Sequence, residues 1–162
     1  MNEETIYYVY WEGPFDWEAQ GKYAKDHHVL YQICGAHHLY GRDVLLYIGS
    51  TSRNIAKRTK KQEELIEGTY DKATVRFGSV GKFTTWEDFY KQRKSGNFQK
   101  ASPGLTRQIE ALLIFAHQPV YNTKNKKDFA DMDIRVFNTG RSGQLFLEVS
   151  SLCFPLESDI KR

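Results

Sequence analysis

The sequence lacks the features that mark several large protein classes. Its two cysteines, Cys34 and Cys153, allow at most one disulfide and cannot supply the paired cysteines of a structural zinc fold. The longest apolar run is six residues, 111–116, against the roughly 20 that a bilayer span requires, so we expect no membrane-spanning segment. The start, Met-Asn-Glu-Glu, has no basic residue followed by an apolar run, which excludes a typical secretory signal and predicts a cytoplasmic location.

Positive charge is absent from the start of the chain and abundant in its middle. Residues 1–20 contain five Asp and Glu but no Lys or Arg, whereas residues 53–127 contain 16 Lys and Arg against seven Asp and Glu. An excess of this size is expected where one face of a protein meets a polyanion. The pattern favours nucleic acid as the partner, although plain solvation of helix surfaces also explains such charge runs.

No repeat or Pro/Ser-rich linker divides the 162 residues, so we expect a single domain over residues 1–162. Runs rich in aromatic and β-branched residues predict strands at 6–11, 28–34, 44–48, 74–79, 134–138 and 145–149. The first of these is expected to end in a turn at Gly13-Pro14. The second and third flank a glycine-containing stretch, 35–43, which predicts a β-hairpin with a long loop.

Four helices are predicted, over 17–26, 54–67, 86–94 and 102–117. Ser52 or Asn54 would cap the second, and Gly68 would stop it. In that helix, the 100° period places the side chains of Ile55, Arg58, Thr59, Gln62, Leu65 and Ile66 inward and those of Lys57, Lys60 and Lys61 outward. We therefore expect Arg58 to face the interior.

The helix over 102–117 carries one carboxylate among apolar positions. Leu105, Ile109, Leu112, Leu113 and Ala116 form its apolar stripe, and Glu110 falls between that stripe and Ile114. A lone carboxylate there is costly unless a base or a metal ion receives it. Together, these elements predict an α/β (α+β) fold with a small antiparallel central sheet flanked by helices and with extra N- and C-terminal strands.

Five motifs then follow one another in an order typical of a known family. They are Val29-Leu30-Tyr31-Gln32-Ile33, Tyr47-Ile48-Gly49-Ser50-Thr51, Arg58, Glu110-Ala-Leu-Leu-Ile and Gln118-Pro119-Val120-Tyr121-Asn122. In this combination they resemble the GIY-YIG nuclease superfamily. The resemblance covers residues 28–122 as a catalytic core, with 1–27 and 123–162 as extensions. Small stand-alone prokaryotic or phage-type members are similar also in Gly13-Pro14-Phe15 and in the segment 138–145.

The resemblance implies a divalent-metal-dependent endonuclease that hydrolyses DNA phosphodiester bonds. Its catalytic residues would be Tyr31, Tyr47, Arg58, Glu110 and Asn122. Glu110 would bind one Mg²⁺ or Mn²⁺, which accepts a single protein carboxylate, and the Arg58 fork would hold the scissile phosphate. Tyr31 would be the general base or water-orienting group with Tyr47 as its partner, provided that a cation lies near it. Asn122 would mainly fix the segment after the helix.

Further phosphate contacts would come from exposed cations on two helices and their flanks. These are Lys57, Lys60, Lys61, Lys91, Arg93, Lys94 and Lys100. The short segments outside the motifs leave no target-reading domain, so we expect structure-directed or weakly specific cutting.

The chain departs from the family pattern at three places. Val29 stands where the first motif usually has Gly, the interval from Tyr31 to Tyr47 is long, and Gln62 stands where relatives often have His. The last departure leaves a proton-transfer role unassigned, for which His117 is a candidate.

Other interpretations of the same residues remain open. The chain could be a catalytically silent nucleic-acid-binding module of the same fold, or a protein-interaction domain. A zinc site would draw on His27, His28, Cys34, His37 and His38, but their spacing fits no standard ligand pattern. We expect these residues to line the hairpin loop and contact DNA.

Overall fold

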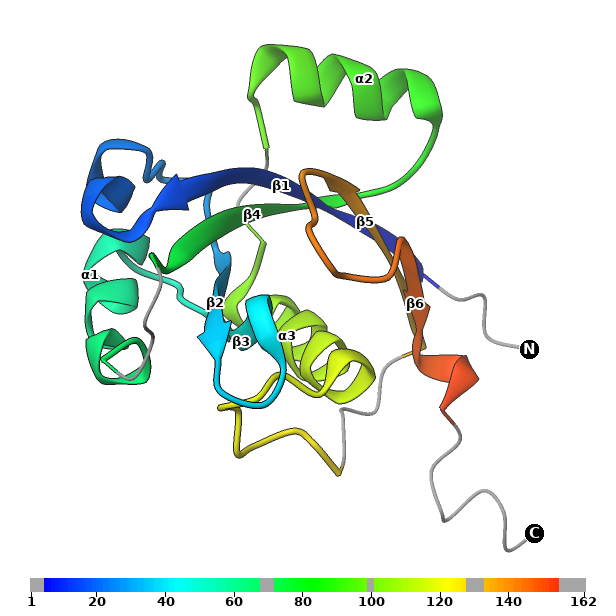
Figure 1. Cartoon of the computed structure of the whole chain (residues 1–162). Helices are drawn as coiled ribbons and strands as arrows, with labels where there is room; N and C mark the ends of the chain where they lie inside the picture. Colours follow the sequence, from blue (N-terminus) through cyan, green and yellow to red (C-terminus); the bar gives the residue numbers. More distant parts are fainter. Residues whose placement is uncertain (1–4, 68–71, 99–100, 128–132, 155–162) are drawn as a thin grey trace, which may run out of the picture.

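One curled six-stranded sheet organises the molecule (Figure 1). The computed structural model describes residues 5–67, 72–98, 101–127 and 133–154. The strand order is β3-β2-β4-β1-β5-β6. Among the helices in these ranges, none combines the length and apolar character needed to cross a membrane.

The sheet is mixed, which corrects the prediction of an antiparallel one. Its strands are β1 (Thr5–Asp16), β2 (Leu30–His37), β3 (Gly41–Ser50), β4 (Thr74–Lys82), β5 (Ile134–Gly140) and β6 (Glu148–Ser150). Neighbours run antiparallel except β1 and β5, which are parallel. The first strand therefore lies inside the sheet, between β4 and β5, so the segments expected as terminal extensions complete the same sheet as the motifs.

Two strand boundaries differ from the prediction for a local reason. β1 does not end at Gly13-Pro14 but continues to Asp16, because a bulge between Glu12 and Phe15 lets a proline sit within the strand. The β2–β3 loop is also short, since pairing extends as far as His37 and Gly41.

The starts of the helices follow the prediction where capping residues are clear. They are the 3₁₀ turn η1 (Trp17–Lys22), α1 (Ile55–Lys60), the 3₁₀ turn η2 (Glu63–Leu65), α2 (Trp86–Ser95), α3 (Pro103–His117) and the 3₁₀ turn η3 (Ser151–Cys153). The hydroxyl of Ser102 accepts from the Leu105 backbone N–H at 3.2 Å, and Asn54 caps α1 in the same way through Lys57 at 3.0 Å. The predicted helix over 54–67 and the η1 segment are shorter than expected.

Arg58 is exposed, which corrects its predicted inward orientation. Only Ile55 and Thr59 of α1 are buried. Because the helix is a turn and a half long, just this i,i+4 pair lies directly over the sheet, and Arg58 lies on the helix flank. The burial predicted from periodicity required a longer helix.

The two faces of the sheet carry separate cores. Val9, Trp11 and Leu30 pack with Leu112 and Leu113 of α3 on one face. On the other face, Tyr31, Ile33 and Phe77 pack with Trp17 and with Ile55 of α1. Figure 1 shows α3 beneath β1 and β4 and α2 on the opposite side of these strands. Alternation along β2 and β3 therefore decides which side chains meet α1 and which meet α3.

Candidate functional site

Tyr31 and Tyr47 lie beside each other on neighbouring strands. Tyr31 pairs with Gly49, and Tyr47 pairs with Ile33, so both tyrosines leave the sheet on the α1 face. Their ring centroids are 6.0 Å apart, with 27° between the ring planes. Tyr31 is completely buried, whereas Tyr47 is half-buried. Of the two residues, Tyr47 is therefore the more accessible to solvent.

Gln62 extends this pair into a chain of polar groups. Its amide Nε2 donates to the Tyr31 hydroxyl over 3.4 Å, and a hydrogen bond from Tyr31 to Tyr47 lowers the pKa of Tyr47. An amide can hold a phenol by a hydrogen bond but cannot accept its proton at ordinary pH. Gln62, which stands where the resemblance implies a His, thus contacts Tyr31. It cannot supply the proton transfer that a His would supply.

Burial keeps both phenols protonated at neutral pH. It raises the pKa of Tyr31 far above its ordinary value, and the pKa of Tyr47 is also raised, chiefly by burial and then by the negative charge of Glu110. The positive charge of Arg58 lowers both pKa values but does not outweigh burial. Arg58 is therefore the cation that Tyr31 would need nearby in order to act as a base. Tyr31 nevertheless remains a neutral hydrogen-bonding group.

Gly49 leaves the space that the Tyr31 ring occupies. A β-carbon at Gly49 would lie 2.4 Å from two atoms of the Tyr31 phenol. We expect Gly49→Ala to push the ring aside and to lower the free energy of unfolding by about 1–3 kcal/mol, a typical cost of overpacking. Urea denaturation measures this loss.

A matched control lies elsewhere on the sheet, because a β-carbon at Gly81 would meet Tyr8 in the same way. Gly81→Ala should be similarly destabilising but should leave the Tyr31–Tyr47 pair in place. Wild-type stability in Gly49→Ala would show that the close approach is not tight.

Glu110 lies on α3, where Ser50 at the end of β3 holds it. The Ser50 hydroxyl donates to the Glu110 carboxylate over 2.5 Å, and the Ser50 backbone adds a second hydrogen bond. Ser50 follows Gly49, so its side chain points to the α3 face, opposite to the tyrosines. Burial raises the pKa of Glu110, while the Ser50 bonds and the charges of Arg58 and Arg107 act in the other direction. Ser50 stands within the Tyr47 motif but was not predicted as a site residue.

The positive charge of Arg58 acts on the other three residues of the candidate site. It lowers the pKa of Tyr31, of Tyr47 and of Glu110. Its side chain is exposed on α1. The tyrosines and the carboxylate therefore flank the end of β3 from its two faces, with a solvent-accessible guanidinium within electrostatic reach of both.

Asn122 fixes the segment after α3 to the strand that carries Tyr47. Its Oδ1 accepts from the Ile48 backbone N–H, and its Nδ2 donates to the Ile48 carbonyl, both over 2.9 Å. The neighbouring Tyr121 N–H donates to the Leu46 carbonyl over 2.8 Å. Asn122 is buried, and these contacts give it the strand-fixing role that the sequence analysis favoured.

His117 does not replace the missing histidine, because both of its ring nitrogens hold backbone groups. The Phe146 N–H donates to Nε2 over 2.8 Å, so the proton resides on Nδ1, which donates to the Leu113 carbonyl over 2.8 Å. Burial lowers the pKa of His117 below its ordinary value of 6.5. This histidine ties the end of α3 to the β5–β6 connection.

That lowered pKa makes stability depend on pH. Below about pH 6.5 the unfolded chain takes up a proton at His117 that the folded chain resists. The contribution of His117 is thus complete above pH 6.5 and declines as the pH falls toward the folded pKa. We expect His117→Gln to have a shallower loss of stability between pH 7 and 5 than the wild type in urea unfolding at stepped pH. Equal slopes in the two proteins would contradict the assignment.

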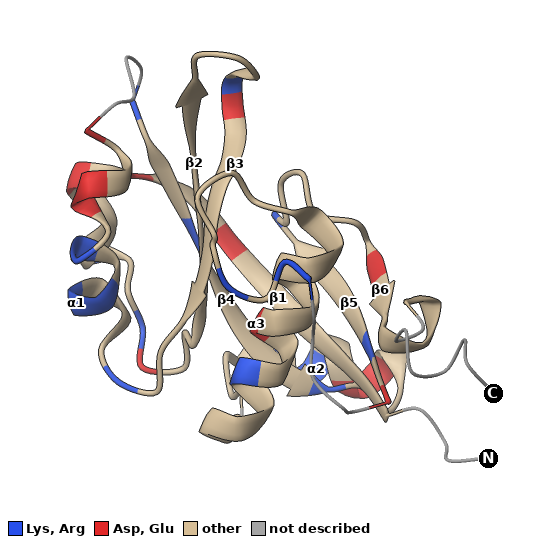
Figure 2. Ribbon diagram, turned by 90° about the horizontal axis from the view of Figure 1, so that it is seen from below, with Lys and Arg blue, Asp and Glu red and all other residues tan. Residues whose placement is uncertain are grey.

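The predicted phosphate contacts divide into two groups. Lys57, Lys60 and Lys61 are exposed on and just after α1, next to Arg58, and Figure 2 shows this basic side of α1. The other three lie on α2, where Lys91 pairs with Glu87 at 2.8 Å and Arg93 stacks over the Tyr10 ring at 5.4 Å. Lys100 lies outside the described residues. Only the α1 group adjoins the tyrosines.

Of the histidines considered for zinc, the structure brings together His27 and His28, and it adds Glu12. His28 Nδ1 accepts from the Lys25 backbone N–H at 3.0 Å, so Nε2 carries the proton and donates to Glu12 over 2.7 Å. The Lys25 ammonium also contacts Glu12 at 2.7 Å. A metal would need the lone pair that this network uses, so the donor set fits an ion-paired cluster better than a metal centre.

The remaining members of the zinc hypothesis lie apart from this cluster. Cys34 is buried on β2 beside Arg76, and burial raises the pKa of its thiol to about 11. His37 stacks on Tyr40 at the tip of the β2–β3 hairpin, with 4.8 Å between the ring centroids.

Comparisons of the chain with protein-family models, curated proteins and solved structures gave no match. Function is therefore inferred from the residues and their contacts.

Proposed function

We propose that the chain is a divalent-metal-dependent endonuclease of the GIY-YIG type, which hydrolyses DNA phosphodiester bonds. The observation that carries this proposal is the meeting of residues far apart in the sequence around the end of β3, where the Tyr31 and Tyr47 rings lie beside each other and Ser50 holds Glu110. Arg58 on α1 acts on the pKa of Tyr31, Tyr47 and Glu110, which come from β2, β3 and α3. Charged and polar groups with perturbed pKa values that gather in this way are typical of catalytic sites.

The four residues match the needs of phosphodiester hydrolysis. Arg58 is exposed and can hold two phosphoryl oxygens as they gain negative charge. Tyr47, half-buried, orients the attacking water by a hydrogen bond, and its deprotonated fraction accepts the proton of that water. Tyr31 lies behind it and holds the Tyr47 hydroxyl in place, so we assign Tyr31 a positioning role in place of the general-base role first expected.

Glu110 fits a Mg²⁺ or Mn²⁺ ion by its chemistry. It is a single hard carboxylate, oriented by Ser50, and Mg²⁺ is commonly held by one or two carboxylates together with substrate phosphate oxygens and water. When bound, the ion would stabilise negative charge on the phosphoryl group. Because Gln62 cannot transfer a proton and His117 is engaged elsewhere, we assign proton supply for the leaving oxygen to solvent.

A catalytically silent nucleic-acid-binding module is the second candidate. The complete burial of Tyr31 and the raised pKa values of both tyrosines favour it, because neither group is poised to accept a proton at neutral pH.

Cleavage assays distinguish the two functions. The purified protein is incubated with duplex, single-stranded, flapped and branched DNA in Mg²⁺, in Mn²⁺ and in EDTA. The nuclease proposal expects nicks or cuts with a divalent metal and none in EDTA. Binding without cleavage for every substrate and metal would establish the silent module instead.

A further inference from the structure

The outer side of α2 presents two large aromatic rings to solvent. Trp86 and Tyr90 are each 57% exposed. They are four residues apart, so they share one side of the helix, and their ring centroids are 6.4 Å apart. Tryptophan is highly buried on average, so two large exposed rings in contact on one side of a helix are a candidate interaction surface.

The inner side of α2 is fixed to the sheet by other residues, so this exposure does not come from a loose helix. Phe89 packs edge-on against Tyr8 at 4.9 Å, and the Tyr8 hydroxyl donates to the Gln92 side chain. The Thr85 hydroxyl caps the helix by accepting from the Asp88 N–H at 3.1 Å. The helix therefore holds its outer side in one orientation.

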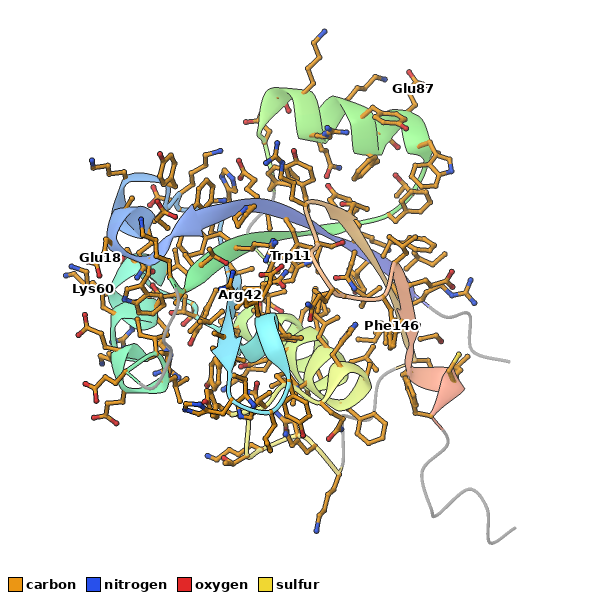
Figure 3. The ribbon with its side chains drawn as sticks, viewed as in Figure 1. Trp11, Glu18, Arg42, Lys60, Glu87 and Phe146 are labelled. Atoms are coloured by element: carbon orange, nitrogen blue, oxygen red, sulfur yellow. The ribbon has the colours of Figure 1, made fainter. Side chains whose placement is uncertain are left out.

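Cations continue the aromatic pair along the helix. Lys94 is exposed one turn after Tyr90, on the same side. A hollow of about 510 Å³ adjoins it, lined by Lys91, Gln92, Lys94 and Ser95. Figure 3 shows the Glu87 side chain projecting from α2 away from the sheet, where it pairs with Lys91. The surface thus combines flat rings with positive charge and has its acidic residues at the beginning of the helix.

The helix α2 packs on the same face of the sheet as the tyrosine pair. Tyr8 and Glu12 alternate onto one face of β1. Glu12 pairs with Phe77 of β4, and Phe77 pairs with Tyr31 of β2. The helix that carries the aromatic pair and Tyr47 therefore lie on the same side of the sheet, with β4 and β2 between β1 and the strand of Tyr47.

We propose that Trp86, Tyr90 and Lys94 form a binding surface for single-stranded DNA, with the two rings stacking on bases and the lysine contacting phosphate. Base stacking tolerates any sequence, because every base has a flat face. The inference rests on the proposed function in treating the strand as part of a DNA substrate, and it narrows that substrate to one with a single-stranded segment, such as a flap or branch.

The sequence provides a built-in reporter for this surface. It has three tryptophans, all in described ranges, and Trp11 and Trp17 are buried, so Trp86 alone is available for stacking. Titration in EDTA with a short oligodeoxythymidine should quench the Trp86 fluorescence. An abasic strand of equal length, or polyglutamate, should not.

Variants then separate stacking from charge. Trp86→Ala or Tyr90→Ala should weaken binding of the labelled strand about 5- to 100-fold, whereas Tyr90→Phe keeps the ring and the affinity. Lys94→Gln should reduce the salt dependence of binding by about 0.7 in the log–log slope. Phe146→Ala, which removes a 59%-exposed ring from the β5–β6 connection, is the matched control and should bind normally.

Three results would overturn the inference. The first is unchanged Trp86 fluorescence on strand binding, and the second is equal quenching by polyglutamate. The third is a Trp86 spectrum that shifts with protein concentration alone, because this indicates that a second copy of the chain binds the surface. Glu110-dependent cleavage without any Trp86 response would overturn this inference but not the nuclease proposal. A Trp86 response in a protein that cleaves nothing would support the surface and contradict the nuclease proposal.

Discussion

Glu110→Gln should abolish metal-dependent DNA cleavage. Losing the carboxylate removes the group that would hold the ion and with it the charge stabilisation of the phosphoryl oxygens. Removing one such group typically lowers the rate about 10²- to 10³-fold or more. Initial rates of plasmid nicking in Mg²⁺ and in Mn²⁺ measure the effect, and DNA binding in EDTA should be unchanged.

The structure also predicts that this variant stays folded. Burial raises the pKa of Glu110, so the folded state holds the ionised carboxylate less well than the unfolded chain does. The resulting loss of stability grows as the pH rises through the ordinary range of glutamate, and a neutral amide avoids it. Glu110→Gln should therefore unfold at the same temperature as the wild type or higher. Glu148→Gln, on β6, is the control carboxylate, and cleavage by Glu110→Gln at the wild-type rate would contradict the site.

The second large effect concerns an asymmetry between the two tyrosines. Tyr47→Phe should lower cleavage more than Tyr31→Phe does, because Tyr47 is half-buried and Tyr31 has no exposed surface. We expect about 10²-fold or more for Tyr47→Phe, the usual range for a group acting on the attacking water. Tyr31→Phe removes only the hydrogen bond behind Tyr47, so its loss should be smaller.

The pH profile distinguishes positioning from catalysis here. The raised pKa of Tyr47 means that the wild-type rate should increase with pH above neutrality, as the deprotonated fraction grows. Tyr31→Phe removes a bond that lowers this pKa, so its profile should shift to higher pH while keeping its shape. Tyr47→Phe should flatten it. The reverse order of effects would return the general-base role to Tyr31.

Local signals in the sequence predicted those parts of the fold that depend on local chemistry. Ser102 and Pro103 determine where α3 begins, and the apolar stripe determines which side of the helix meets the sheet, so the position of Glu110 followed. The hairpin that carries Tyr31 and Tyr47 was predicted from two β-branched and aromatic runs. Asn122 lies in the turn after α3, and this position alone was enough to predict a structural role for it.

Features that depend on distant partners were not predictable. The pairing of β1 with β5 joins residues that no local pattern connects. The orientation of Arg58 depended on helix length, which tertiary packing decides. Glu12 carries no motif, and its contact with His28 exists because the β1 bulge and the segment before β2 meet. Ser50 belongs to the Tyr47 motif, but its hydrogen bond to Glu110 depends on where α3 packs, which the motif does not predict.

The place of the first strand has a consequence for how the chain folds. β1 precedes the other strands of the sheet in the sequence, yet one of its two hydrogen-bonding edges pairs with residues 134–140, far along the chain. Until those residues are made, that edge is a template for pairing with other chains. The contact that closes it joins positions far apart in the sequence, which slows folding. A chain truncated before Ile134 would retain Tyr31, Tyr47, Arg58 and Glu110 and still leave β1 as an unpaired edge of its sheet, so its expected fate is aggregation.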